Sequence, residues 1–181
     1  MKVKQMATVA VTTAVVCVLG PLAVPVGPVP ITLCVLGIFL AVYLLGMRGG
    51  TLAVLLYLLI GMAGLPVFSG FSAGPGKLLG PTGGYLVGYI FMALIAGFFI
   101  DRFEKKWYLQ FAGMALGLAA LYAFGTVWLA VQAHMTFAQA LWAGVIPFVA
   151  FDLCKLAAAL AIGRVLKARL RQAALLGAAR A

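Results

Sequence analysis

Two side chains of opposite charge stand three positions apart in the stretch FDLCKL: Asp152 and Lys155. Residues at this spacing share one face of a helix, so the two side chains can meet. A charge inside an apolar helix is costly unless it is paired or faces a cavity, which makes both residues candidates for function. Together they offer one hydrogen-bond acceptor beside one donor, which suits a polar, planar ligand with N–H next to C=O. The alternative is a neutralised pair that only packs the helices.

Other side chains with catalytic potential are scarce. His134 is the only histidine and has no carboxylate or cysteine at ligand spacing, so we interpret it as a solvated or interfacial side chain. Ser69 and Ser72 lack matching His and Asp partners, which argues against a serine hydrolase. The cysteines show no C-x-x-C or Cys/His spacing, so we expect no zinc or other metal site and no disulfide framework. We interpret them as buried apolar residues: Cys17, Cys34 and Cys154.

A glycine-rich stretch, FSGFSAGPGKLLGPTGGYLVG at 68–88, resembles a phosphate-binding loop in its middle. That loop requires G-x-x-x-x-G-K-[ST], with a hydroxyl after the lysine. Here five residues separate Gly70 from Gly76, and Leu78 follows Lys77. We therefore expect no nucleotide site in this chain.

The end of the same stretch, GPTGGY at 80–85, is a tight turn that includes Thr82. Gly83 and Gly84 let the backbone approach either a ligand or another helix closely, and the sequence leaves both meanings open. Phe71 and Tyr85 add aromatic surface nearby, which could stack on a ring or anchor the chain at a membrane interface.

The elements that position these residues belong in lipid. The composition is 66% hydrophobic and 9% charged, whereas charged residues make up about a quarter of a soluble domain. A membrane-crossing helix needs about 20 mostly apolar residues. The sequence predicts an all-α membrane protein that forms one transmembrane domain over 1–181. Its six predicted spans are 6–24, 31–47, 50–65, 82–100, 108–131 and 147–166.

The connections between spans carry their own signals. Four prolines in PLAVPVGPVP predict an ordered, non-helical loop after the first span: Pro21, Pro25, Pro28 and Pro30. Pro66 ends the third span. Thr136 is the predicted N-cap of a short helix over 137–143 that stops at Gly144, and Pro147 fits the first turn of the last span. We expect the loops to form the walls of a pocket at the outer face, because irregular backbone at membrane depth must be buried or line a cavity.

The distribution of the basic residues predicts the orientation. The 13 Lys and Arg against 3 Asp and Glu would suggest nucleic-acid binding in a soluble protein. With both termini in the cytoplasm, however, nearly all the cations lie in cytoplasmic segments, as the positive-inside rule requires. The exceptions are Lys77 and Lys155. The cations assigned to the cytoplasm are Lys2, Lys4, Arg48, Arg102, Lys105, Lys106, Arg164, Lys167, Arg169, Arg171 and Arg180.

Two pairs of small residues have the spacing that permits close helix packing in lipid. Ala10 and Ala14 lie on the first span, and Gly113 and Gly117 lie on the fifth. Each pair could contact a partner protein or another helix of the same chain.

Four blocks of the sequence resemble one known family. They are VPVGPVPITLCVLGIFL, RGGTLAVLLYLLIGMAGLPVFSG, LLGPTGGYLVGYI and PFVAFDLCKLAAAL. In this order, with D-x-x-K in the last span, the chain resembles the BioY proteins, the biotin-specific substrate-binding S components of energy-coupling factor (ECF) transporters. The resemblance covers about 24–163.

The resemblance implies a six-helix protein of a bacterial or archaeal cytoplasmic membrane that binds biotin and is not an enzyme. The pocket would lie beneath the first and third loops, with Asp152 and Lys155 on the ureido head. The ring would rest against Phe71 and Tyr85, and the carboxylate tail would meet loop amides, with Lys77 as a possible charge partner.

The implied partners lie outside this chain. They are a transmembrane coupling subunit of the EcfT type, which would contact Ala10 and Ala14, and ABC-type ATPases, which alone would use ATP. Three alternatives stay open. They are an S component for thiamine or riboflavin, a membrane enzyme that uses Asp152 and His134, and a passive channel, which the few polar residues of the spans disfavour.

Overall fold

Helices make up most of the computed structural model, which describes residues 3–25 and 29–172. Pro28 of the predicted proline-rich loop, and the predicted cytoplasmic cations Lys2 and Arg180, lie outside the described residues. The elements in chain order are α1 (Val3–Leu19), β1 (Ala23–Val24), β2 (Ile31–Thr32), α2 (Cys34–Met62), the 3₁₀ helix η1 (Ser69–Phe71), α3 (Pro75–Leu79), α4 (Gly83–Arg102), α5 (Trp107–Gln132), α6 (Phe137–Gly144) and α7 (Ile146–Gln172).

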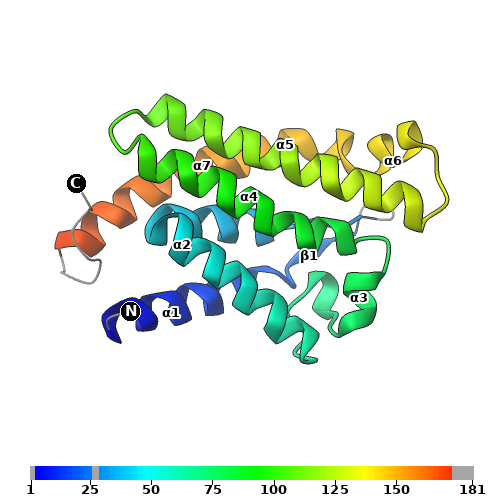
Figure 1. Cartoon of the computed structure of the whole chain (residues 1–181), viewed down its shortest axis with the longest axis horizontal. Helices are drawn as coiled ribbons and strands as arrows, with labels where there is room; N and C mark the ends of the chain where they lie inside the picture. The colour runs from blue at the N-terminus through cyan, green and yellow to red at the C-terminus, as the bar shows by residue number, and fades with distance from the viewer. Residues whose placement is uncertain (1–2, 26–28, 173–181) are drawn as a thin grey trace.

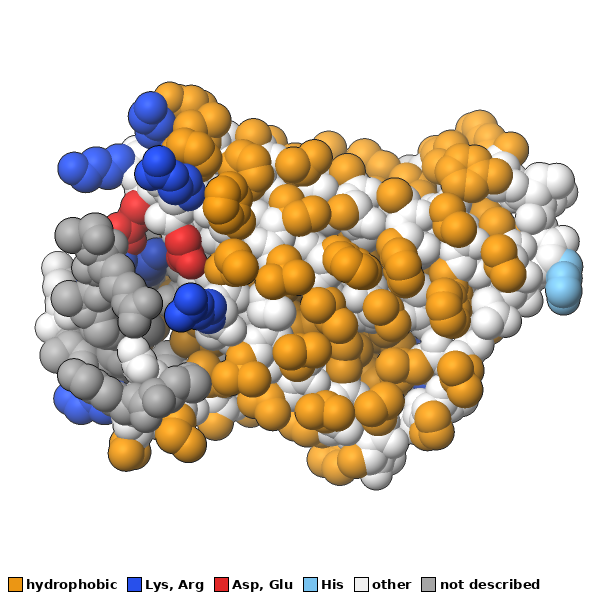
Figure 2. Space-filling view, in the orientation of Figure 1, with side chains coloured by type: hydrophobic (Ala, Val, Ile, Leu, Met, Phe, Trp, Pro, Cys, Tyr) orange, Lys and Arg blue, Asp and Glu red, His pale blue; other side chains and the backbone are white. Residues whose placement is uncertain are grey.

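The long helices run roughly side by side along the longest dimension of the molecule (Figure 1). Among the described residues, four are long and apolar enough to cross a membrane: α2, α4, α5 and α7. Apolar side chains cover most of the visible surface between the two ends (Figure 2). Such a surface is stable only against lipid or other protein, so the predicted class of a mostly helical membrane protein is confirmed.

Helix α2 spans both the second and the third predicted segments and changes direction between them. Gly46 has φ 72° and ψ −176°, which are not helical values. A Cβ atom on Gly50 would lie 2.6 Å from the Cα atom of Val42, although residues eight apart in a straight helix are separated by about 12 Å. The chain therefore folds back at Gly46. The Met47 amide there donates a 2.8 Å hydrogen bond to the Asp101 carboxylate of α4.

The first helix is shorter than predicted, since it ends at Leu19 and not near residue 24. The following proline-rich segment is non-helical as expected, and it pairs with itself. Ala23 pairs with Thr32 and Val24 with Ile31 in a two-stranded antiparallel ribbon. The third predicted span likewise ends early, at Met62 instead of 65.

The small residues of α5 serve packing within the chain. A Cβ atom on Gly113 would lie 2.1 Å from the Cβ of Phe99, and one on Gly117 would lie 2.9 Å from the Met92 carbonyl oxygen. Both neighbours belong to α4, so the glycines allow α4 and α5 to approach closely.

The two ends of the molecule differ in character. The start of α1, the α4–α5 connection and the end of α7 lie at one end, whereas β1, α3 and α6 lie at the other (Figure 1). Charged side chains gather at the first end on the visible face, and His134 lies at the tip of the second (Figure 2).

An ion cluster joins the α4–α5 connection to α7 at the charged end. The Glu104 carboxylate forms ion pairs with Lys167, at an N–O distance of 3.2 Å, and with Arg171, which also donates a hydrogen bond to it. Partial burial of Glu104 acts to raise its pKa, but the two cations outweigh burial and lower the pKa below its ordinary value.

The short helix α6 is confirmed together with its cap. The Gln139 amide donates to the Thr136 hydroxyl, and the Thr136 amide donates to the Gln139 side chain, which forms a capping box. The helix includes Gly144, one residue more than predicted. Pro147 lies in the first turn of α7, as expected.

Candidate functional site

Asp152 and Lys155 form the predicted ion pair. The Lys155 Nζ lies 2.7 Å from Asp152 Oδ1, and their side chains are 11% and 6% exposed, respectively. Because α7 begins at Ile146, the pair lies in its second and third turns. Both charges are thus largely removed from solvent. The attraction between them offsets part of the free-energy cost of desolvating each one.

A residue that the sequence analysis missed completes this group. The Tyr122 hydroxyl of α5 donates a 2.6 Å hydrogen bond to Asp152 Oδ2, so each carboxylate oxygen has one donor. An ionised carboxylate can accept about four hydrogen bonds, which leaves acceptor capacity on Asp152. Thirty positions separate the two residues, and no local spacing could have linked them.

The pair opens onto a cavity with a volume of about 40 Å³, which we call the charged-pair cavity. Apolar side chains line it opposite the charges, among them Val35, Leu121 and Phe148. A buried water occupies roughly 10–15 Å³ on this scale, so the space is that of about three waters.

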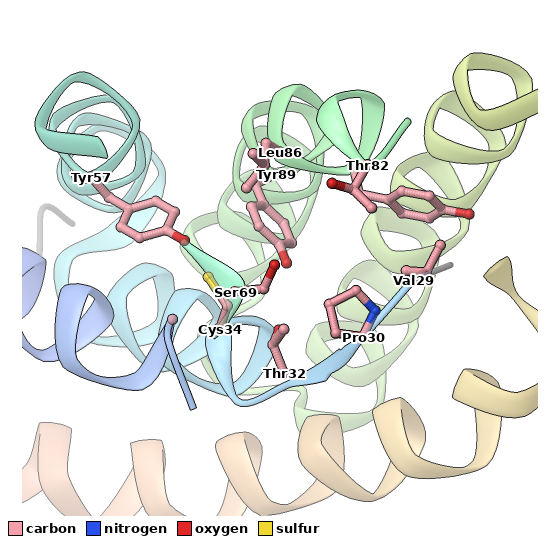
Figure 3. A pocket seen from close by; sticks show the side chains of 11 residues that line it. Val29, Pro30, Thr32, Cys34, Tyr57, Ser69, Thr82, Leu86 and Tyr89 are labelled. Carbon is pink, nitrogen blue, oxygen red and sulfur yellow. The ribbon is translucent and has the colours of Figure 1, made fainter. Parts of the chain in front are cut away.

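A second cavity of about 30 Å³ lies beside the first, and we call it the hydroxyl cavity. Six hydroxyl residues and one thiol line it: Thr32, Tyr57, Ser69, Thr82, Tyr85, Tyr89 and Cys34. Figure 3 shows the hydroxyls of Tyr57 and Tyr89 directed toward Ser69 and Cys34. None of the described residues that line this cavity is acidic or basic.

One wall separates the two cavities and belongs to both. It consists of Val29, Pro30, Thr32, Tyr85 and Tyr89. These residues come from the segment around β2 and from the first turns of α4, two regions that the sequence analysis placed at the pocket. The two cavities are thus neighbours, one lined by the charged pair and the other by hydroxyl groups.

Four predicted site residues line this site: Asp152 and Lys155 in the charged-pair cavity, Thr82 in the hydroxyl cavity, and Tyr85 in both. The Tyr85 hydroxyl donates to the Gly144 carbonyl at 3.2 Å, which fixes its ring between the cavities.

The other four predicted residues lie elsewhere. Phe71 is 68% exposed, and neither Phe71 nor Lys77 lines the charged-pair cavity or the hydroxyl cavity. A Cβ atom on Gly83 would lie 1.6 Å from the Leu78 carbonyl oxygen, and one on Gly84 would lie 2.2 Å from the Trp128 Cβ. Of the two meanings left open for this pair, close packing is the one these contacts support.

The small residues of α1 face outward, unlike those of α5. Ala10 and Ala14 are exposed, whereas the opposite face of the helix buries Val9, Thr13 and Val16. The described part of the chain therefore does not use the alanine pair for its own packing.

His134 is exposed in the turn between α5 and α6, while Asp152 is buried with Tyr122 and Lys155 as its partners. The acid–base pair that a membrane enzyme would need is not assembled.

Comparison with known proteins gives a consistent result. A family model described as the BioY family matches residues 1–172. A protein of Thermotoga maritima named biotin transporter BioY is 43% identical over 91% of this chain and 96% of its own length. One of Pyrococcus horikoshii named probable biotin transporter BioY is 37% identical over 92% of this chain and 98% of its own length.

A solved structure has the same fold. The crystal structure of an S-component for biotin from an ECF-type ABC transporter superposes with a TM-score of 0.86 and 32% identity, over 92% of each chain.

Proposed function

The chain belongs to the BioY family, and we infer that it binds biotin and moves it across a membrane as the S component of an ECF-type transporter. It is a transporter component and not an enzyme. The resemblance seen in the sequence is confirmed.

The observation that carries the ligand assignment is the buried pair of Asp152 and Lys155 at the edge of a cavity. The ureido group of biotin offers N–H donors beside a carbonyl acceptor. The Asp152 carboxylate accepts an N–H, and the Lys155 ammonium donates to the carbonyl. Apolar residues across the charged-pair cavity, such as Phe148, then contact the ring.

The cavities together are smaller than a biotin molecule, so their walls must separate when the ligand enters. We propose that the segments around Val29 and Thr82 move for this purpose, because they belong to connections and not to the middle of helices. Thr82 and Tyr85 contact the bound vitamin. Phe71 and Lys77 reach it only if their loop moves inward, and Gly83 and Gly84 contribute by holding the start of α4 against its neighbours.

We propose a multi-pass arrangement in the cytoplasmic membrane of a bacterium or archaeon, with the charged end in the cytoplasm and the cavities toward the outer face. Counting the two halves of α2 separately on either side of Gly46 gives six membrane helices with α1, α4, α5 and α7. The basic residues at the end where α1 starts and α7 ends support this orientation. Residues 1–181 then act as one transmembrane substrate-binding domain.

The partners proposed for transport are a coupling subunit of the EcfT type and ABC-type ATPases. The exposed Ala10 and Ala14 surface of α1 would contact the coupling subunit, since small residues let two helices approach closely. ATP would be hydrolysed only by the ATPases.

Equilibrium binding of labelled biotin to the purified chain in detergent tests the function. We expect stoichiometric binding that unlabelled biotin displaces and that thiamine and riboflavin do not. The double variant Asp152→Asn/Lys155→Ala should lose binding while it keeps its helical circular dichroism spectrum. Displacement by thiamine or riboflavin would instead favour an S component for another vitamin.

A further inference from the structure

We propose that the hydroxyl cavity is the subsite for the carboxylate of biotin, with Tyr57 and Tyr89 as its main donors. The inference rests on the proposed function, because it assigns the second end of the same ligand. It differs from the sequence-based expectation, which gave the carboxylate to loop amides and Lys77.

The cavity is rich in donors that have weak partners. Tyr57 is 1% exposed and Tyr89 7%. The Tyr57 and Tyr89 hydroxyls point toward Cys34 and Ser69 (Figure 3), so the group between them is a thiol and not a strong acceptor. A thiol is a weak acceptor, so it leaves much of the donor strength of two phenols unused. A stronger acceptor placed between the two rings would accept a hydrogen bond from each hydroxyl.

The chemistry of the lining favours an anion over other polar groups. All the polar side chains that the structure describes in the hydroxyl cavity can donate, and none of them carries a carboxylate. A hydrogen bond to an ionised acceptor is about twice as strong as one between neutral groups, so a carboxylate gains most from such a lining. The volume of about 30 Å³ suits a group of the size of a carboxylate.

The position of the cavity fits the shape of the ligand. Biotin carries its ureido ring and its carboxylate at opposite ends of a methylene chain. Three members of the shared wall, Val29, Pro30 and Tyr85, offer apolar surface to both the charged-pair cavity and the hydroxyl cavity. The methylene chain can cross this wall with the ring at Lys155 and the carboxylate between Tyr57 and Tyr89.

The test compares biotin with its primary amide, which has nearly the same shape but no charge. Dissociation constants of both ligands are measured for the wild-type chain, Tyr57→Phe and Tyr89→Phe. Tyr43→Phe is the matched control, since Tyr43 is also a buried tyrosine but donates to Gln110, and neither residue lines either of the two cavities. Ser69→Ala provides a further variant outside the long helices should a tyrosine variant fail to fold.

We expect the wild-type chain to prefer biotin over the amide, and each cavity variant to reduce this preference. For the tyrosines the reduction is about 5- to 10-fold, because a lost hydrogen bond to a charged group costs more than one to a neutral group. Tyr43→Phe leaves the preference unchanged.

Two results would overturn the assignment. One is an unchanged preference in all the cavity variants. The other is a preference lost in Lys155→Gln and kept in the tyrosine variants, which would mean that the ligand lies the other way round. Failure of the wild-type chain to bind either ligand would instead refute the proposed function itself.

Discussion

Replacing Tyr122 by Phe removes one hydroxyl from the site and little else. The hydroxyl donates to Asp152 Oδ2 at 2.6 Å, while Lys155 holds Oδ1 at 2.7 Å. The aromatic ring, and so the packing between α5 and α7, is retained. The variant therefore measures how much the Tyr122 hydroxyl contributes to ligand binding when the ion pair of Asp152 and Lys155 is kept.

The expected magnitude follows from the burial of the carboxylate. A hydrogen bond to a charged group contributes about 1.5–3 kcal/mol. Without ligand, a water in the charged-pair cavity can replace the missing donor, because the cavity has room for about three. Bound biotin displaces that water, so most of the loss falls on affinity and not on folding. We expect biotin to bind about 10-fold or more weakly, and the unfolding temperature to change by only a few degrees.

The assay is equilibrium binding of labelled biotin in detergent, together with thermal unfolding of the same preparations. Tyr43→Phe is again the matched control, since its hydroxyl makes a 2.8 Å hydrogen bond to Gln110 that is also buried. This control should lower the unfolding temperature, because Gln110 loses a partner, and should bind biotin as the wild-type chain does.

An affinity for biotin equal to that of the wild-type chain would refute the reasoning. It would mean that Lys155 alone holds Asp152 in position. A loss of unfolding temperature in Tyr122→Phe as large as in the control would show that water does not replace the hydroxyl.

Three further predictions test other parts of the molecule. Gly46→Ala should lower stability by about 1–3 kcal/mol, since φ is 72° and a Cβ atom would lie 2.6 Å from the Asp101 carboxylate; thermal unfolding measures this. The pKa of Glu104 is lowered in the folded protein, so its contribution to folding stability is complete above about pH 4.5, the ordinary pKa. This contribution is lost as the pH falls through the lower pKa of the folded state. Because Glu104 is 38% exposed, we expect its ion pairs to stabilise the fold by less than about 1 kcal/mol. The difference in unfolding temperature between wild type and Glu104→Gln should vanish in acid. A difference that stays constant with pH would exclude this contribution of the ion pairs. Ala10→Trp should prevent co-purification with a coupling subunit and leave biotin binding intact, whereas Val11→Trp, also on exposed α1 surface, should change neither property; loss of co-purification in both variants would indicate a general effect on the helix.

The sequence predicted best what depends on neighbours along the chain. Asp152 and Lys155 meet because three positions make less than one helical turn, and Thr136 caps α6 because its partner Gln139 is equally local. The apolar helices follow from composition alone. Their ends were less accurate, since Leu19 and Met62 end their helices where loop contacts and not hydropathy decide.

What the sequence could not supply comes from contacts between distant segments. Tyr122 reaches Asp152 from another helix, and Tyr57 meets Tyr89 only after α2 has folded back against α4. The glycines illustrate the same limit. The sequence left a ligand or a helix as the neighbour of Gly84, and a partner protein or a helix as the neighbour of Gly113. Only Trp128 and Phe99 in the structure show that both glycines lie against another helix.

The reversal at Gly46 has a consequence for how the protein is made. Its two sides, 34–45 and 47–62, are about 18 Å and 24 Å long, both shorter than the roughly 30 Å hydrocarbon core. A translocon that releases helices one at a time would therefore find neither segment long enough alone. We expect the two to leave the translocon together, as a helical hairpin already closed by Gly50 against Val42. Insertion assays on a truncated nascent chain that ends near Gly46 should show a first half that does not stay in the membrane until the second half has been synthesised.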